Sequence, residues 1–506
     1  MISGLLSVPL LGILFILLLT PTKPHFGRQQ KTVSFISFMT AAYTFFYSFI
    51  FLKEIYKIDS FYGPEPEVIE WLNHYVSPLA FRMDGLSSVF VLLTTFIILL
   101  VVISLCFNTK VLSHQFYKGY FISVLLIEFL LLGAFTVDDI LFFYIFFESV
   151  LIPMYFIIGI WGSGFRKIKA GYYFFLFTLI GSLFMLLSII LLTMATGHTS
   201  LQIYLFYSIP TEIQHLLWLF FFLAFSVKIP LFPFHIWLPE AHVEAPTEGS
   251  VILAALLLKL GGYGFIRFTL QLLPDASIYF SPFIYTLSIL GVTYASFTAV
   301  RQTDMKRIIA YASVAHMNFA VLGIFAMNSD ALSGAIFLMI GHGIVSSALF
   351  FLVGVLYKIY GTRLIHYYGG LAHVMPIFSA FFLFFSFANI GLPGTSNFVG
   401  ELLIFLGVGS WSPVAAICCS FGFILSVAYS IWLYNRICFG SLRTLYVISF
   451  KDIAPSDIAI LIPLTLVTLL LGICPSLLLD TFSRSSTFLI LKQVDLHFRL
   501  CNIGPL

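Results

Sequence analysis

Long apolar segments separated by short polar connections recur along nearly the whole chain. A helix needs about 20 consecutive apolar residues to cross the hydrocarbon layer of a membrane. Measured against that length, the pattern predicts an all-α polytopic membrane protein with about fourteen transmembrane helices. The predicted helices cover residues 2–20, 32–52, 85–106, 118–136, 139–160, 170–194, 214–232, 249–271, 278–299, 305–326, 333–357, 376–408, 413–438 and 456–478.

The placement of lysine and arginine predicts how these helices are oriented. When the connections are numbered in chain order, the odd ones carry 16 basic residues and the even ones carry four. Because basic residues mark the inner side of a membrane, we expect the odd connections inside and both termini outside. The even set is Lys53, Lys57, Arg82 and Arg267, and the odd set includes Lys306.

Two polar segments are longer than the others. The connection from Lys53 to Ala80 carries five acidic residues and is interpreted as a solvated outer loop. The tail after Pro475 mixes apolar residues with spaced basic ones, which indicates an interfacial helix or an arm that docks on a partner.

Composition supports the membrane assignment and excludes several functions. Hydrophobic residues make up 60% of the chain and charged residues 9%, whereas soluble proteins carry about 25% charged residues. The net charge of +3 indicates no nucleic-acid surface. The six cysteines form no C-x-x-C pair, and both the dinucleotide and the P-loop glycine motifs are missing. We therefore expect no metal, flavin, iron–sulfur cluster or nucleotide in this chain.

Four charged residues lie inside predicted helices, where a charge costs roughly 2.5 to 3.5 kcal/mol on insertion scales. They are Glu148, Lys228, Lys259 and Glu401. One interpretation is a structural ion pair that only links two helices. Two lysines are more than such a link needs, and the pKa of a desolvated lysine changes readily, which suits a proton carrier. Proton translocation is therefore the favoured interpretation of this set.

Histidine also titrates near neutral pH. Four histidines lie in or beside the apolar segments, and together they predict a proton relay rather than a metal site: His235, His242, His316 and His342. Glu128 also lies mid-helix but ranks lower, because a single helix–helix hydrogen bond would explain it. Asp84 stands where a helix N-cap is expected, which accounts for its charge.

Two predicted helices are interrupted. Three prolines between Pro230 and Pro239 break helix 7, and the segment 391–397 breaks helix 12. Paired broken helices are typical of inverted repeats in transporters, so helices 4–8 and 9–13 are predicted to form two inverted five-helix units. The corresponding divisions are 1–117 for helices 1–3, 118–272 and 273–440 for the two repeats, and 441–506 for helix 14 and the tail.

Six segments resemble the subunit 4 family of antiporter-like proteins in the membrane arm of respiratory complex I, the proton-pumping NADH:ubiquinone oxidoreductase. These segments are 146–154, 227–230, 235–247, 257–261, 313–318 and 392–401. The string Leu-Pro-Glu-Ala-His-Val-Glu-Ala-Pro at 238–246 is more similar to subunit 4 than to its paralogues, subunits 2 and 5. One departure is Glu248, which stands where a small residue is expected.

The resemblance implies a role for each buried charge. Glu148 and Lys228 would form the pair of the input half-channel, Lys259 the central proton carrier, and Glu401 the terminal acid on the output side. The four histidines would belong to a polar axis. NADH, flavin, iron–sulfur clusters and ubiquinone would be handled by other subunits, and the expected neighbours are subunits 2 and 5 and lipids.

Two alternatives stay open at this point. A subunit of a Mrp-type sodium/proton antiporter would use the same fold without redox chemistry, and a passive spacer in the membrane arm would use none of the buried charges. Phenylalanine occurs 59 times in 506 residues, which suggests an AT-rich organellar genome. With no presequence apparent, this favours the mitochondrial inner membrane over a bacterial plasma membrane.

Overall fold

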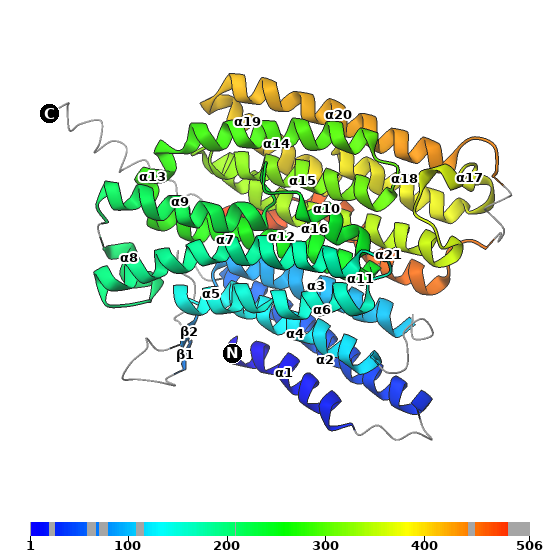
Figure 1. Ribbon diagram of the computed structural model, residues 1–506, viewed down its shortest axis with the longest axis horizontal. Coiled ribbons are helices and arrows are strands. Elements are labelled where there is room, and N and C mark those ends of the chain that lie inside the picture. The colour runs from blue at the N-terminus through cyan, green and yellow to red at the C-terminus, as the bar shows by residue number, and fades with distance from the viewer. Residues whose placement is uncertain are drawn as a thin grey trace.

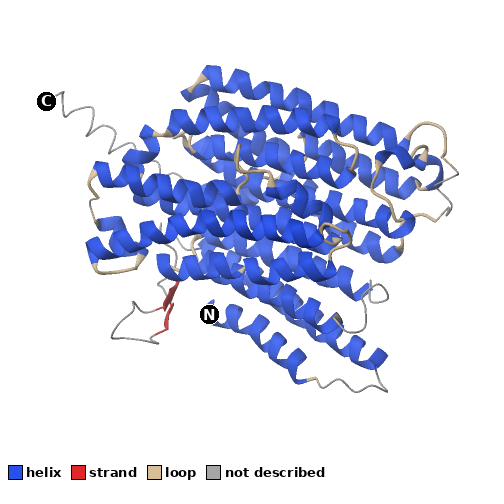
Figure 2. Cartoon of the chain, viewed as in Figure 1, coloured by secondary structure: helices blue, strands red, loops and turns tan. Residues whose placement is uncertain are grey.

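Long helices packed side by side make up the protein, as a computed structural model shows (Figure 1). The structure describes residues 2–19, 26–57, 67–69, 79–107, 116–207, 209–443 and 451–483. Most of the predicted outer loop between residues 53 and 80, and the tail beyond residue 483, lie outside this set. Figure 2 shows helix throughout the bundle and strand only in one small hairpin of the described part.

The N-terminal part of the bundle begins at one edge with α1, and its later helices reach the middle of the bundle in Figure 1. Its helices are α1 (Ile2–Leu18), α2 (Phe26–Lys57), α3 (Gly85–Phe107), α4 (Tyr117–Thr136), α5 (Ile140–Ser149), α6 (Leu151–Trp161), α7 (Lys167–Thr196), α8 (Leu201–Phe206) and α9 (Thr211–Lys228). The hairpin between α2 and α3 pairs β1 (Glu67–Ile69) antiparallel with β2 (Leu79–Phe81).

The remaining helices fill the centre and the opposite edge. They are α10 (Trp237–Glu244), α11 (Thr247–Ile252), the π-helix η2 (Leu253–Leu257), α12 (Leu258–Gly264), the π-helix η3 (Phe265–Leu270), α13 (Pro274–Tyr279), α14 (Ser281–Arg301), α15 (Met305–Ile324), α16 (Ser329–Tyr360), η4 (Ile365–Tyr367), α17 (Leu371–Val374), α18 (Pro376–Ile390), α19 (Ser396–Trp411), α20 (Pro413–Cys438) and α21 (Pro455–Ile473).

Eleven helical segments in the described part are long and apolar enough to cross a membrane, and α1, α18 and α19 are shorter apolar helices. An all-α polytopic architecture is therefore confirmed. The count of fourteen spans and the inverted repeat stay predictions.

The most deeply buried segments are α16 and the run from Thr247 to Leu270 that comprises α11 to η3. A helix that is apolar on every side must be surrounded by other helices or by lipid, and these two are surrounded by protein. α16 packs against α15, α19, α11, η2 and α21. Outer helices such as α7 and α20 instead expose apolar side chains, as lipid-facing helices do. The two central segments carry Lys259 and His342.

Both predicted helix interruptions are present. α9 ends at Lys228 and the proline-containing segment follows before α10, while α18 ends at Ile390 before Gly391 and α19 begins at Ser396. Two further irregularities were not predicted. α5 and α6 are separated at Val150, where Pro153 has no N–H to donate to the Ser149 carbonyl four residues earlier. The second is the pair of π-helices around α12.

Candidate functional site

Lys259 lies fully buried in α12, between the two π-helices. Its Nζ donates a hydrogen bond of 2.6 Å to the carbonyl of Ala254 in η2 and lies 3.0 Å from Nδ1 of His342 on α16. A π-helical turn widens the helix and is often found at functional sites. Here it leaves a backbone carbonyl within reach of the lysine side chain, which holds the ammonium group against His342.

A continuous row of titratable side chains runs on from Lys259. The rings of His342 and His316 lie 5.5 Å apart between centroids, and Nδ1 of His316 on α15 lies 3.3 Å from Oε1 of Glu401 on α19. His342 also hydrogen bonds through Nε2 to the Ser313 hydroxyl at 3.2 Å. We call Lys259, His342, His316 and Glu401 the central row. Its members come from four helices, and all of them are buried.

Glu401 is held against the interruption of its own broken helix. Gly391 caps the end of α18 with φ of +83°, a conformation that favours glycine. A Cβ atom at this position would lie 2.3 Å from Oε2 of Glu401, so the close approach also requires glycine. A cavity of about 20 Å³ beside His316 is lined by Tyr429 among others. Since a water molecule needs roughly 10–15 Å³, one water fits there.

Glu148 and Lys228 are near each other but not in direct contact. The Lys228 Nζ is buried at the end of α9, 4.5 Å from the centre of the Phe147 ring, in a cation–π arrangement. Glu148 follows Phe147 on α5 and is the charged group whose field acts on Lys228. Among the described residues no ion pair within 4.0 Å joins the two. Both the Lys228 Nζ and the Glu148 Oε2 are buried without a hydrogen-bond partner.

The two histidines near the first break occupy different environments. His242, on α10, stacks on Phe350 with ring centroids 4.6 Å apart, and neither ring nitrogen has a hydrogen-bond partner. Its ring lies within electrostatic reach of Lys259. His235 instead packs among the rings of Phe232, Tyr294 and Tyr311. The structure therefore brings His242 toward the central row and leaves His235 in an aromatic cluster.

Glu128 on α4 contacts the N-terminal helices. Its Oε1 accepts a hydrogen bond of 2.6 Å from the Thr44 hydroxyl on α2, and its side chain is fully buried. This is the single helix–helix hydrogen bond that was the simpler interpretation of this residue.

Lys306 is a buried helix residue and not a loop charge, which is a correction to the count of basic residues in the connections. It was assigned to an inner loop, but it lies in the first turn of α15 and is only 2% exposed. Its Nζ donates to the carbonyl of Ala245 at 2.8 Å and lies 3.2 Å from the Ser250 hydroxyl. Hydropathy gives no signal for this burial, because the residue stands at a helix boundary and is buried by another part of the chain.

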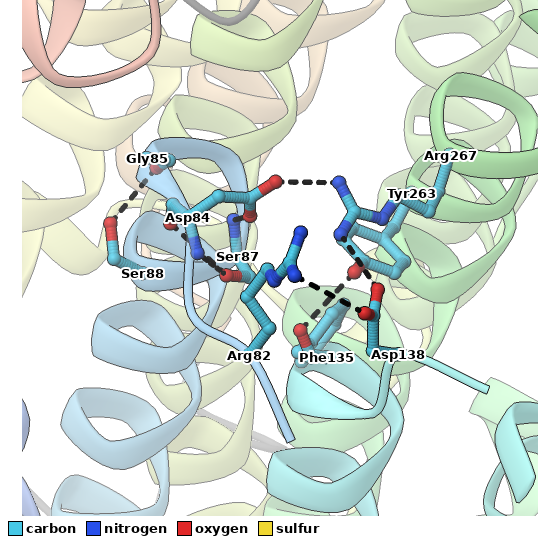
Figure 3. Close-up of polar contacts among 9 residues, drawn as sticks. All are labelled: Arg82, Asp84, Gly85, Ser87, Ser88, Phe135, Asp138, Tyr263 and Arg267. Carbon is cyan, nitrogen blue, oxygen red and sulfur yellow. Dashed lines mark hydrogen bonds and ion pairs between the residues drawn. The ribbon is translucent and has the colours of Figure 1, made fainter. Parts of the chain in front are cut away.

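Arg267 requires the same correction, whereas Arg82 lies in the connection before α3, as expected. Both were counted as outer-loop charges, yet Arg267 lies in η3 and is 8% exposed. Figure 3 shows Arg267 directed at Asp84 and Asp138, with ion pairs of 2.5 and 3.9 Å, while Arg82 lies 3.7 Å from Asp138. We call these four residues the outer ion cluster. The cluster joins the start of α3, the end of α4 and the helix that carries Lys259.

Asp84 both caps the start of α3 and pairs with Arg267. Its carboxylate accepts from the Ser87 N–H at 3.0 Å, which confirms the predicted N-cap, and the Ser87 hydroxyl accepts from the Asp84 N–H. Burial alone would raise the pKa of Asp84, but Arg267 and the Ser87 hydrogen bonds outweigh it and lower the pKa below its usual value. For Asp138 burial prevails over Arg267 and Arg82, and its pKa is raised.

The described residues contain no group of three or more histidine, cysteine or acidic side chains arranged to hold a metal ion. Charged and titratable groups are buried between the helices of this bundle, and two of these helices are broken. Together these features define a class of protein: an antiporter-like ion-translocating membrane subunit.

Comparison with known proteins identifies the family. Residues 137–426 match the family model for the membrane domain of NADH:quinone oxidoreductase and Mrp antiporters. The chain is 46% identical to NADH-ubiquinone oxidoreductase chain 4 of Marchantia polymorpha over 97% of both chains. It is 48% identical to chain 4 of Chondrus crispus over 95% of this chain and 96% of that one. The chain therefore belongs to this family, and within it to chain 4 of NADH-ubiquinone oxidoreductases.

Solved structures support the fold. A chain of respiratory complex I from Thermus thermophilus with bound NADH superposes with a TM-score of 0.84 at 29% identity, over 97% of this chain and all of that one. A chain of the Mrp complex from a Dietzia species has a TM-score of 0.81 over 97% of both chains, but only 18% identity, which shows a shared fold alone. The relatives therefore favour complex I over the antiporter alternative.

Proposed function

We propose that this subunit translocates protons along the central row, with Lys228 as the donor to Lys259. The chain is a proton-translocating membrane subunit of NADH:ubiquinone oxidoreductase, a multi-pass protein of the mitochondrial inner membrane. The observation that carries the proposed route is the row of neighbouring side chains in which Lys259 meets His342 at 3.0 Å, the rings of His342 and His316 lie 5.5 Å apart, and His316 meets Glu401 at 3.3 Å.

The chemistry of this row suits proton transfer. Proton transfer between side chains requires hydrogen-bond distances of about 2.6–3.2 Å, or one intervening water. The link from Lys259 to His342 lies in that range, and the pair of His316 and Glu401 lies just beyond it. A histidine can accept a proton at one ring nitrogen and release one from the other. The His342 ring is oriented by hydrogen bonds to Lys259 through Nδ1 and to the Ser313 hydroxyl through Nε2, and its contact with His316 is between the rings, with centroids 5.5 Å apart. Transfer between the two histidines would use an intervening water.

The fourteen helices and two inverted units, 118–272 and 273–440, are part of the proposal. Lys259 lies in the first unit, whereas His342, His316 and Glu401 lie in the second. A row that crosses from one unit to the other would connect two half-channels that open on opposite sides. The broken helices that end at Lys228 and precede Glu401 support this division.

Energy coupling would act through Glu148 and Lys228. Weakening their interaction would release the Lys228 proton toward Lys259. Moving one charge across 100 mV costs about 2.3 kcal/mol, which is roughly a 50-fold change in proton binding. The absence of a direct ion pair supports this scheme, because a side-chain movement at Glu148 would then change the field at Lys228 without breaking a hydrogen bond.

The neighbours are also proposals. Subunits 2 and 5 would flank this chain in the membrane arm, and lipids would cover its exposed apolar helices. Flavin, iron–sulfur clusters and ubiquinone would be bound by other subunits of the complex.

The test replaces Lys259 with alanine or glutamine in the assembled complex. Protons moved per NADH oxidised should fall, because the row loses its first carrier. The matched control is Lys169→Ala, which removes an exposed lysine of α7. A passive spacer would leave the ratio unchanged in every variant, and that result would refute the proposed route.

A further inference from the structure

A groove of about 510 Å³ lies between α18 and α21 and is open at the surface of the bundle, where Ile377 is exposed. Five of its lining residues belong to α18 and one to α21: Pro376, Ile377, Ala380, Phe381, Phe384 and Thr465. The Thr465 hydroxyl donates to the carbonyl of Ile462 in its own helix, and the other lining side chains are apolar. The groove therefore suits an apolar occupant.

The spacing of residues along α18 explains the shape of the groove. Ile377, Ala380 and Phe384 are three and four positions apart, so they lie on one face of the helix. Ala380 is exposed and small, and it stands between two larger side chains. Its methyl group leaves the middle of the groove open, whereas a large side chain at that position would fill it.

The length of the groove matches one leaflet of a membrane. From Pro376 to Phe384 there are eight helical steps, or about 12 Å at roughly 1.5 Å for each residue. The hydrocarbon layer is about 30 Å thick, so each leaflet contributes about 15 Å. The groove begins at the end of α18 that the basic residues place on the inner side. A partner helix that crosses the membrane would need a contact face about twice as long, whereas one acyl chain of an inner-leaflet lipid fits.

The inner end of the groove is polar. The carboxylate of Asp452 accepts hydrogen bonds from the N–H groups of Ile377 at 2.8 Å and Phe378 at 3.2 Å, and so caps the start of α18. The neighbouring Lys451 is exposed, and among the described residues it takes part in no ion pair within 4.0 Å. Because Asp452 is bonded to backbone donors, the ammonium group of Lys451 is the charge that remains for an anionic headgroup.

We propose that this groove binds a phospholipid of the inner leaflet, with one acyl chain along Ile377, Ala380 and Phe384 and its phosphate group near Lys451. An apolar groove of one-leaflet length with a cation at its headgroup end carries this inference. It goes beyond the proposed proton route and does not depend on it. The bound chain would cover α18, the half of the broken helix that precedes the half carrying Glu401.

The site is tested with a phosphatidylglycerol that carries a diazirine at the middle of one acyl chain. The assembled complex is reconstituted with this lipid, washed with detergent, irradiated and digested for peptide mass spectrometry. Cross-links to residues 376–384 should survive the wash, whereas those to the lipid-facing side of α20 around Ile417 should fall about ten-fold or more. If the wash removes both equally, the groove holds only exchanging lipid and the site is refuted. If residues 376–384 are not cross-linked even before the wash, a partner protein covers the groove and the site is also refuted.

Filling the groove tests its shape. Ala380→Trp places a large ring in the groove, and Ala380→Leu is a smaller replacement that keeps the test valid if the first variant assembles poorly. Cross-links to residues 376–384 that resist the wash should fall about ten-fold with tryptophan and less with leucine. The matched control is Ile417→Trp, which adds a ring to an exposed face of α20 and should leave them unchanged. Cross-linking at the wild-type level in both Ala380 variants would overturn the proposal.

The headgroup contact is tested by changing its charge. A lysine near a membrane surface strengthens the binding of anionic lipid about five-fold. Lys451→Glu should therefore lower the wash-resistant cross-linking by at least that factor, and Lys451→Arg should retain it. Lys169→Glu, which changes an exposed lysine near the start of α7, is the control and should have no effect. Equal cross-linking in Lys451→Glu and the wild type would refute the site at its headgroup end.

The outcomes separate this inference from the proposed function. Lys259 lies in α12 and does not line the groove, so Lys259→Ala should keep the wild-type cross-links to residues 376–384. If Lys259→Ala pumps like the wild type while these cross-links are present, the proton route fails and the lipid site stands. If the cross-links are missing while Lys259→Ala abolishes pumping, the lipid site fails and the proton route stands.

Discussion

Replacing Arg267 with methionine should destabilise the outer end of the helix that carries Lys259. The guanidinium group pairs with Asp84 at 2.5 Å and with Asp138 at 3.9 Å, and the side chains of both acids are less than a tenth exposed. Methionine fills a similar volume but carries no charge. The substitution therefore leaves buried carboxylates that have lost a cation.

The magnitude follows from the contacts that remain. Removing one partner of a buried ion pair costs about 3–5 kcal/mol, because the other charge stays buried. Asp84 keeps the Ser87 N–H at 3.0 Å and Asp138 keeps Arg82 at 3.7 Å. We therefore expect the lower end of the range, about 3 kcal/mol, or roughly a 100-fold change in the equilibrium between folded and unfolded states.

The assay is a double-mutant comparison in the purified complex. The temperature at which the subunit unfolds, and the amount of complex assembled, should fall for Arg267→Met. Both should recover in part in the double variant with Asp84→Asn, because the uncompensated charge is then removed. If the double variant is no more stable than Arg267→Met, the buried charge is not the cause and the reasoning is wrong.

Acidity offers a second check on the same cluster. The pKa of Asp84 is lower in the folded protein than in the unfolded chain, so its ionised form stabilises the fold above the unfolded pKa of about 3.9. That contribution is lost as the pH falls through this value toward the lower folded pKa. The stability difference between wild type and Asp84→Asn should therefore shrink on acidification below about pH 4, measured by the unfolding temperature.

Two further predictions concern the central row. His342→Phe keeps a ring of similar shape but cannot carry a proton, so pumping should fall about 100-fold or more, measured as proton uptake in vesicles; pumping at the wild-type rate would show that protons bypass this ring. Gly391→Ala should destabilise the subunit by about 1–3 kcal/mol and move Glu401, because its Cβ would lie 2.3 Å from the carboxylate; an unchanged unfolding temperature and unchanged pumping would contradict this.

Hydropathy is a local property of the chain, and it located the apolar segments that are long enough to cross a membrane. The apolar segments, the two helix interruptions and the burial of Lys228, Lys259 and Glu401 could all be predicted, because each depends on neighbouring residues alone, whereas Glu148 is half-buried. The family was likewise identifiable from short motifs, which are continuous in sequence.

Contacts between helices could not be predicted in this way. Lys259 and His342 are 83 positions apart, and only the packing of α12 against α16 brings them to 3.0 Å. The sequence pattern predicts Arg267 and Lys306 as loop charges, yet both are buried, because a residue at a helix end is covered or exposed according to which other segments pack against it.

Glu248 shows the same division between sequence and tertiary structure. Its position in the sequence marked it only as an acid where a small residue was expected. The Ser104 hydroxyl that donates to it, and most of the cavity of about 550 Å³ that it lines, belong to helices distant in sequence. The sequence by itself located the apolar helices and the charges in their middle. The tertiary structure decided which of them meet, because burial in a helix bundle is shared among segments that no local pattern relates to one another.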